Sequence, residues 1–257
     1  MANSSSHLDR HFTMPTIRTV DAARPLVWLR KAWNDVLESP VASLSYGVFF
    51  SVLGYLILAF ASDKPHLFPA AISGFFLVGP LAAAGLYEIS RRHEAGRSCS
   101  LVESMAGIVR HKDQLFQFGL LLAIVLIGWE RMSAILFAMF FGGDAPDPGN
   151  FFTEVLFSGR YVHFVVAYMV LGGALAALVF ALAAVAVPML MDRESDVVTA
   201  MMSSARAVGC NPGAMILWAA IIVAGMLLGF ASLMFGMIVL LPIIGHATWH
   251  AYRDLVA

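Results

Sequence analysis

The hydrophobic positions of the chain fall into long, uninterrupted runs separated by short polar segments. The runs show no alternation of apolar and polar residues, so they are typical of helices and not of strands. A backbone embedded in lipid must satisfy its own hydrogen bonds, and about 20 apolar residues in a helix cross a hydrocarbon core of about 30 Å. We therefore predict an all-α, polytopic membrane bundle. Its six expected spans are at about residues 41–62, 67–90, 114–141, 161–190, 212–229 and 232–252.

The last apolar run is long enough for two of these helices. No Asp, Glu, Lys or Arg occurs between Ala207 and Tyr252, and a single helix of that length would measure about 69 Å. Because this is about twice the thickness of a bilayer, we place a turn at residues 229–232. One alternative stays open, in which residues 213–229 form a re-entrant segment.

Three amphipathic segments precede the first, third and fifth expected spans. They are WLRKAWNDVLESP, which ends at Pro40, the segment Leu101–Arg110, and residues 197–206. Each is typical of a short interfacial helix that lies along the inner leaflet. Ser100 is the expected N-cap of the second, and Ser195 or Asp196 of the third. The expected apolar faces are Leu101, Met105 and Ile108 in the second helix, and Val197, Met201 and Ala205 in the third.

The even-numbered spans share a proline in their inner half. These prolines are Pro80, Pro188 and Pro242. Proline removes a helical hydrogen bond, so each should kink its helix. Tyr87 and Arg91 follow Pro80 at the same spacing at which Trp249 and Arg253 follow Pro242, and we expect these four side chains to be interfacial anchors at headgroup level. Together these features predict a pseudo-threefold internal repeat of helical hairpins with three interfacial amphipathic helices.

The distribution of basic residues predicts the orientation. Thirteen Lys and Arg lie on the side of the N-terminus and three on the other side or near it, so both termini should be cytoplasmic. Residues 1–23 are polar and lack the apolar core of a signal peptide, which predicts a disordered cytoplasmic tail. Residues 24–257 then form the six-helix membrane domain, multi-pass in a bacterial inner membrane.

Composition agrees with this class of protein. The chain is 60% hydrophobic and only 13% charged, whereas a soluble domain carries about 25% charged residues. A net charge of −1 argues against a nucleic-acid partner. The expected partners are membrane lipids and other membrane proteins.

Several strings resemble a known family. WLRKAWNDVLESPVASLSYG, FFLVGPLAAAGLYEISRRHEAG, VPMLMDRESDVVTAMMSSARAVGCNP and PIIGHATWHAYRDL are similar to the bacterial predicted integral membrane proteins catalogued as domain of unknown function 2189. The resemblance runs from about Arg24 to the C-terminus. The family has no established activity, so the resemblance implies a class and a topology but no substrate and no site residue.

Few residues offer chemistry. His246 and His250 are four apart on one helix face, a spacing that suits a metal or haem iron. The simpler interpretation, which we prefer, is that they are polar residues at the inner end of a helix. Glu130 and Arg131 are charged residues in an apolar stretch and are candidates for transport or for helix pairing. The other interpretation is that this span ends at Trp129 and both charges reach the headgroups. Neighbours in a helix point about 100° apart, so we do not expect this pair to bond to each other.

Charged residues also gather at the inner ends of the even spans. Glu88, Arg91 and Arg92 form one group, and Asp192, Arg193 and Glu194 form another. They could form a pairing network between repeats or bind anionic lipid headgroups, and the simpler interpretation is that they are solvated helix ends. His93 in this region should be exposed.

The sequence contains no Walker loop, Gly-x-Ser-x-Gly, His-Glu-x-x-His or dinucleotide fingerprint. We therefore expect a non-enzymatic accessory, assembly or lipid-interacting membrane protein without a cofactor or catalytic residue. The alternatives are a small transporter or channel and a haem- or metal-binding subunit of a respiratory complex.

Overall fold

The computed structural model describes residues 14–61, 75, 79, 81, 83–142, 154–155 and 158–257, and these residues are predominantly helical. The all-α fold class is thereby confirmed for this part of the chain. The helices are α2 (Arg24–Glu38), α3 (Pro40–Ala61), α5 (Ala84–Glu94), α6 (Leu101–Arg110), α7 (Lys112–Phe141), α9 (Val162–Ala183), α10 (Ala186–Asp192), α11 (Val197–Cys210), α12 (Pro212–Ala231) and α13 (Met237–Leu255).

Four stretches are long and apolar enough to cross a membrane. They are Pro40–Ile57, Lys112–Phe141, Val162–Asp192 and Pro212–Ala231, and they agree with the first, third, fourth and fifth expected spans. The second expected span, with Pro80, falls largely outside the described residues, and α5 contains its inner end. The sixth coincides with α13, which is not among the four. The six-span arrangement therefore stays a prediction.

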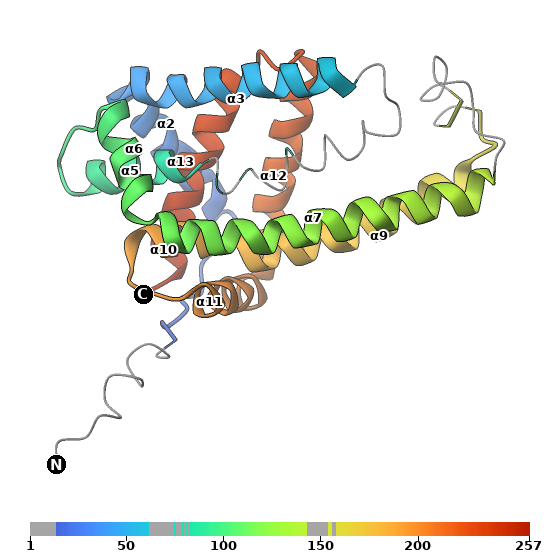
Figure 1. Ribbon diagram of the computed structural model, residues 1–257. Helices are drawn as coiled ribbons and strands as arrows, with labels where there is room; N and C mark the ends of the chain where they lie inside the picture. Colours follow the sequence, from blue (N-terminus) through green and yellow to red (C-terminus); the bar gives the residue numbers. More distant parts are fainter. Residues whose placement is uncertain are drawn as a thin grey trace.

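The helix α13 forms the centre of the molecule. It packs against α2, α3, α5, α10 and α12. Its inner half is buried without interruption from Gly245 to Tyr252. Figure 1 shows α13 and α12 side by side, crosswise to the direction of α7 and α9. The two hairpins α7–α9 and α12–α13 therefore do not share one direction.

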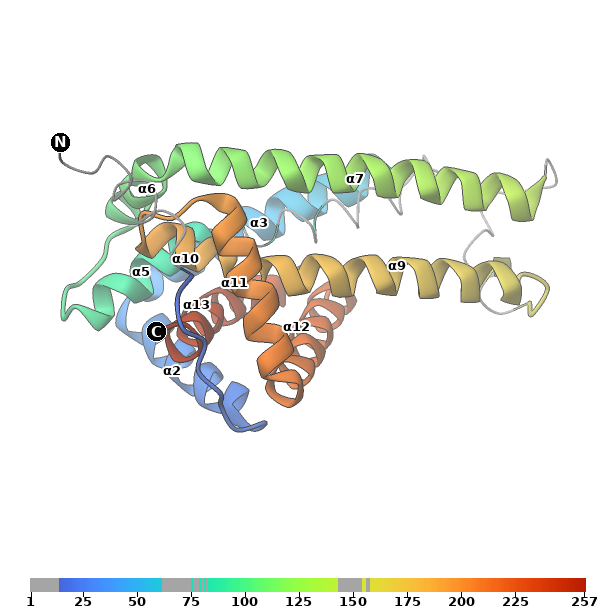
Figure 2. The same cartoon turned by 90° about the horizontal axis from the view of Figure 1, so that it is seen from below.

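The long helices α7 and α9 run together away from this centre (Figures 1 and 2). Aromatic side chains join them: the rings of Trp129 and Tyr168 lie 5.1 Å apart, and those of Phe141 and Phe164 lie 4.9 Å apart. Their outer faces expose large apolar side chains such as Phe116, as expected of surfaces that face lipid. Because α7 continues to Phe141, the helix does not end at Trp129.

The three expected amphipathic helices are present as α2, α6 and α11, each directly before a long apolar helix. Ser100 caps α6 in a reciprocal capping box with Glu103, and Asp196 caps α11 by accepting from Thr199 N at 2.9 Å. These two N-caps are as predicted.

The predicted apolar faces of α6 and α11 were partly wrong. Leu101, Ile108 and Met201 pack against the core. Met105 is exposed as predicted, and the other exposed apolar positions are Val102 and Val109 on α6 and Val198 and Met202 on α11. A helical segment with apolar residues on two sides does not reveal from its sequence which side the protein covers.

The prolines act differently at their two described positions. The helix α9 ends at Ala183 and α10 begins at Ala186, so the chain departs from regular helix just before Pro188. This is where the proline ring would crowd the preceding turn. In contrast, α13 continues through Pro242.

Residues 14–23 are ordered, in contrast to the expected disordered tail. The backbone of Ile17 pairs with that of Val256, and Arg18 N donates to Leu255 O at 2.8 Å. Asn211, at the end of α11, accepts from Val20 N at 2.7 Å. Residues 1–13 lie outside the described residues.

Candidate functional site

The most polar part of the buried core is centred on Asp35 of α2. Its carboxylate accepts hydrogen bonds from Ser90 Oγ at 2.5 Å and His250 Nε2 at 2.9 Å, both to Oδ2, and lies 3.1 Å from His93 Nδ1 through Oδ1. The Asp35 residue is only 6% exposed. One carboxylate therefore holds α2, α5 and α13 together.

A chain of hydroxyl and imidazole groups extends this centre to α3. His246 Nδ1 lies 2.7 Å from Ser90 Oγ, and His246 Nε2 lies 3.0 Å from Ser43 Oγ. Because Ser90 donates to Asp35, His246 Nδ1 must donate to Ser90 and Nε2 must accept from Ser43. Both ring nitrogens of His246 are thus engaged in hydrogen bonds that join α13 to α3 and α5.

His93 lies on the opposite side of Asp35 and has two further neighbours. Its Nε2 lies 2.8 Å from Ser39 Oγ, at the junction of α2 and α3. Its Nδ1 also lies 3.8 Å from Glu38 Oε2. The His93 side chain is 3% exposed, so the expectation that it is solvated was wrong.

The environment of Asp35 favours its charged form. Burial alone would raise the pKa of this carboxyl, but the hydrogen bonds from His250, His93 and Ser90 outweigh burial and hold its pKa well below the ordinary value of 3.8. The centre therefore carries a negative charge at neutral and mildly acidic pH.

A dependence of stability on pH follows from this. A carboxyl whose pKa is depressed by folding contributes stability that is present above its ordinary pKa and is lost as the pH falls through the depressed value. We expect the destabilisation caused by Asp35→Asn to shrink as the pH falls below about 4, because the unfolded wild type then takes up a proton that the folded carboxylate does not, which lowers the stability of the wild type. Denaturant titrations of both proteins over a pH series measure this difference. A difference that grows on acidification would contradict the assignment.

Ion pairs surround the centre at the ends of the helices. Arg253 Nε lies 3.0 Å from Glu94 Oε2, and Arg253 also lies 3.3 Å from Asp192 Oδ2. Tyr252 donates to the same Asp192 oxygen at 2.7 Å and accepts from Arg193 at 2.9 Å. The charged residues Asp192 and Arg193 thus belong to a pairing network and are not simply solvated helix ends.

A second buried carboxylate, Glu88 of α5, is neutralised by arginines. Its oxygens lie 2.8 Å from Arg91, 3.2 Å from Arg92 and 2.8 Å from Arg110. Gly107 of α6 packs against the Glu88 side chain so closely that a Cβ there would lie 2.5 Å from Glu88 Cγ. This contact fastens α6 to α5.

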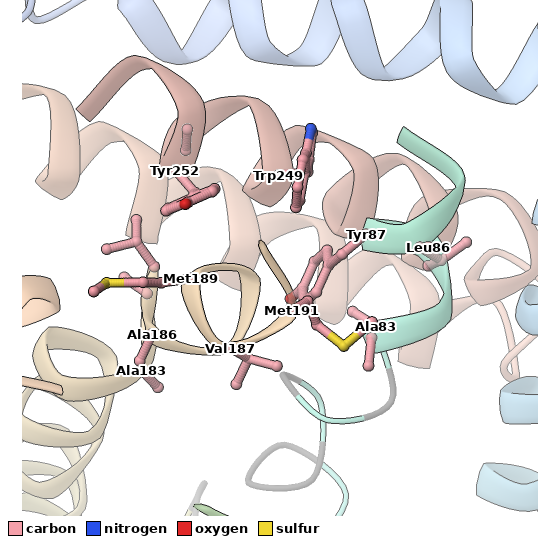
Figure 3. Close-up of a cluster of buried hydrophobic side chains, with 14 of the residues drawn as sticks. Ala83, Leu86, Tyr87, Ala183, Ala186, Val187, Met189, Met191, Trp249 and Tyr252 are labelled. Carbon is pink, nitrogen blue, oxygen red and sulfur yellow. The ribbon is translucent and has the colours of Figure 1, made fainter. Parts of the chain in front are cut away.

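The two aromatic residues that we expected as headgroup anchors are inside the protein. Tyr87 is 2% exposed and Trp249 is fully buried. Figure 3 shows Tyr87 close to Met191 of α10, and Trp249 and Tyr252 of α13 in the same buried cluster. The protein core surrounds the rings, so they are not placed at its surface. Arg91 and Arg253 are held in the ion pairs described above.

Glu130 and Arg131 bond to each other, contrary to the expectation. Arg131 Nε lies 3.1 Å from Glu130 Oε2, and the two side chains are 76% and 40% exposed for Arg131 and Glu130 respectively. The long arginine side chain bends back toward its neighbour, which the angle between the two Cα–Cβ directions does not prevent. The pair lies on the outer face of α7, far along the chain from the Asp35 centre.

Three residues of the centre, Asp35, Ser90 and His93, were not predicted as site residues. A signal for Asp35 existed in the sequence. The buried face of α2 contains Pro25, Trp28, Ala32, Asp35 and Val36. An acidic residue among apolar ones at helical spacing indicates a buried partner, because an unpaired buried charge is costly. His250, 215 positions away, could not be identified as that partner from spacing.

Comparisons with known proteins confirm the class of the chain. No curated protein and no solved structure gives a significant match. The model of the family described as predicted integral membrane protein (DUF2189) matches residues 67–192, which include the helices α5 to α10. Just under half of the chain is therefore similar to this family of predicted integral membrane proteins.

Proposed function

We propose that the chain is a non-enzymatic accessory membrane protein that binds anionic lipids of the cytoplasmic leaflet through α2, α6 and α11. The observation that carries this proposal is the composition of their exposed faces. Each face combines apolar side chains with an arginine: Leu26, Trp33, Leu37 and Arg30 on α2; Val102, Met105, Val109 and Arg110 on α6; Val198, Met202 and Arg206 on α11.

Such faces suit the boundary between headgroups and acyl chains. Apolar side chains enter the acyl region, while arginines attract the phosphates of anionic lipids. The positive-inside distribution supports placing these helices, and both termini, on the cytoplasmic side of a bacterial inner membrane. Each of these short helices is followed directly by a long apolar helix. This order supports the threefold internal repeat.

The alternative functions receive less support. Glu130 and Arg131 pair with each other on an exposed face of α7. A transport pathway would need a buried charge, and this pair does not provide one. His246 has both ring nitrogens occupied by serines, which argues against a haem ligand.

Trp33 allows a direct test. It is 47% exposed, whereas Trp28, Trp218 and Trp249 are fully buried and Trp129 is 7% exposed. In vesicles that contain a small fraction of brominated lipid, we expect lipids brominated near the headgroup to quench the fluorescence more than lipids brominated deep in the chain. We also expect brominated phosphatidylglycerol to quench more than phosphatidylcholine brominated at the same depth.

Two variants and a control complete this test. Trp33→Phe should remove most of the quenching, and Arg30→Gln should remove the preference for phosphatidylglycerol. Arg131→Gln, which changes another exposed arginine, on α7, should leave the preference unchanged. Quenching that does not depend on headgroup charge, or that survives Trp33→Phe, would contradict the proposal.

A further inference from the structure

We propose that Asp35, Glu38 and His93 bind one divalent transition-metal ion, for which Zn²⁺ is the probe. One ligand atom from each residue lies within 4.8 Å of the other two. The site combines the last two turns of α2 with the last turn of α5. It is independent of the lipid-binding faces.

The distances between ligand atoms suit a tetrahedral ion. His93 Nδ1 lies 3.1 Å from Asp35 Oδ1 and 3.8 Å from Glu38 Oε2. A tetrahedral Zn²⁺ with bonds of about 2.0–2.1 Å holds its ligand atoms about 3.3 Å apart. Both distances from His93 are within about half an ångström of this separation, and the carboxylate oxygens of Asp35 and Glu38 lie within 4.8 Å of each other. A fourth position remains for water.

The neighbouring hydrogen bonds already hold the ligands as a metal would require. Asp35 keeps Oδ2 bonded to Ser90 and His250, which leaves Oδ1 directed toward His93. Ser39 Oγ lies 2.8 Å from His93 Nε2 and, as a hydroxyl, either donates or accepts. When Nδ1 binds the ion, the ring proton resides on Nε2 and is donated to Ser39. Such outer partners fix the tautomer of a ligating histidine.

The chemistry of the donors selects the type of ion. Two carboxylates supply the negative charge that a divalent cation neutralises, and an imidazole favours Zn²⁺ or its neighbours over Ca²⁺ and Mg²⁺, which prefer oxygen. Glu38 is 58% exposed, whereas the Asp35 and His93 side chains are nearly buried. Glu38 thus lies where an ion would enter from the surface.

The histidine pair on α13 has a different part in this arrangement. His250 positions Asp35 through Nε2, and its Nδ1, 3.6 Å from Glu94 Oε1, is too far for a direct hydrogen bond. His246 supports Ser90. Both are positioning residues behind the ligands.

Metal analysis of the full chain in lipid nanodiscs tests the proposal. The protein is prepared without a histidine tag and with His7 and His11 replaced by Gln, stripped with a chelator and equilibrated with Zn²⁺. We expect one tightly bound Zn²⁺ per chain, and Co²⁺ in its place should show the intense visible absorption of a tetrahedral site. Absence of stoichiometric Zn²⁺ would overturn the proposal.

Variants distinguish this site from adventitious binding. Glu38→Gln changes an exposed side chain, so the fold should persist while the Zn²⁺ affinity falls more than tenfold. Ser39→Ala removes an outer partner and should weaken binding about tenfold. Glu194→Gln, an exposed carboxylate outside the site, is the matched control and should bind like the wild type. Equal affinity of Glu38→Gln and wild type would refute the assignment.

Discussion

Replacing Asp35 with alanine should lower the free energy of unfolding by about 3–5 kcal/mol, the usual cost of removing one partner from a buried charged network. Ser90, His93 and His250 would each lose a buried acceptor. Because these donors lie on α5 and α13, the loss affects the junction of three helices at once. The midpoint of unfolding, followed by circular dichroism in mixed micelles with increasing denaturing detergent, measures the effect.

Two further variants separate the role of the carboxylate from that of its volume. Asp35→Asn keeps the size and one acceptor oxygen, so it should cost less than alanine. Glu194→Ala removes an exposed carboxylate and should change the midpoint little. If Asp35→Ala unfolded at the same point as Glu194→Ala, the network would not hold the junction.

The sequence was sufficient to predict the features that depend on local pattern. Continuous apolar runs predict α3, α7 and α12, because lipid leaves the backbone no alternative to a helix. Ser100 and Asp196 were predicted as N-caps because a cap depends on a side chain and an amide three residues away.

Features that depend on how helices cover each other were not predicted. Tyr87 and Trp249 have the composition and spacing of interfacial anchors, but α13 is enclosed by other helices and both rings are buried. Likewise, His250 gains its partner Asp35 only when α2 covers α13. Sequence patterns specify which face of a helix is apolar, but not whether lipid or protein lies against it.

The close contact of α3 with α13 depends both on local sequence pattern and on how the helices cover each other. Small residues in the first span predict close packing of helices, and Gly47 provides it. A Cβ at Gly47 would lie 2.1 Å from the carbonyl oxygen of Ile238. That carbonyl is four residues before Pro242, which has no N–H to donate to it. Gly47 Cα itself lies at most about 3.6 Å from the oxygen, the range of a Cα–H···O contact. The proline and the glycine are thus complementary.

Gly47→Ala should therefore destabilise the protein by about 2–3 kcal/mol, a cost typical of forcing extra atoms into a packed core. The neighbour that must move is the backbone of α13, which packs against α3 and four other helices, so it cannot give way as a flexible side chain would. Gly173→Ala is the matched control, because a Cβ at this helical glycine meets nothing within 4 Å. Alanine is the better helix former, so the control should be neutral or slightly stabilising. The same unfolding titration compares the two variants. If Gly47→Ala were as stable as Gly173→Ala, the approach of α3 to the Ile238 carbonyl would be looser than described, and Pro242 would require another partner for that oxygen.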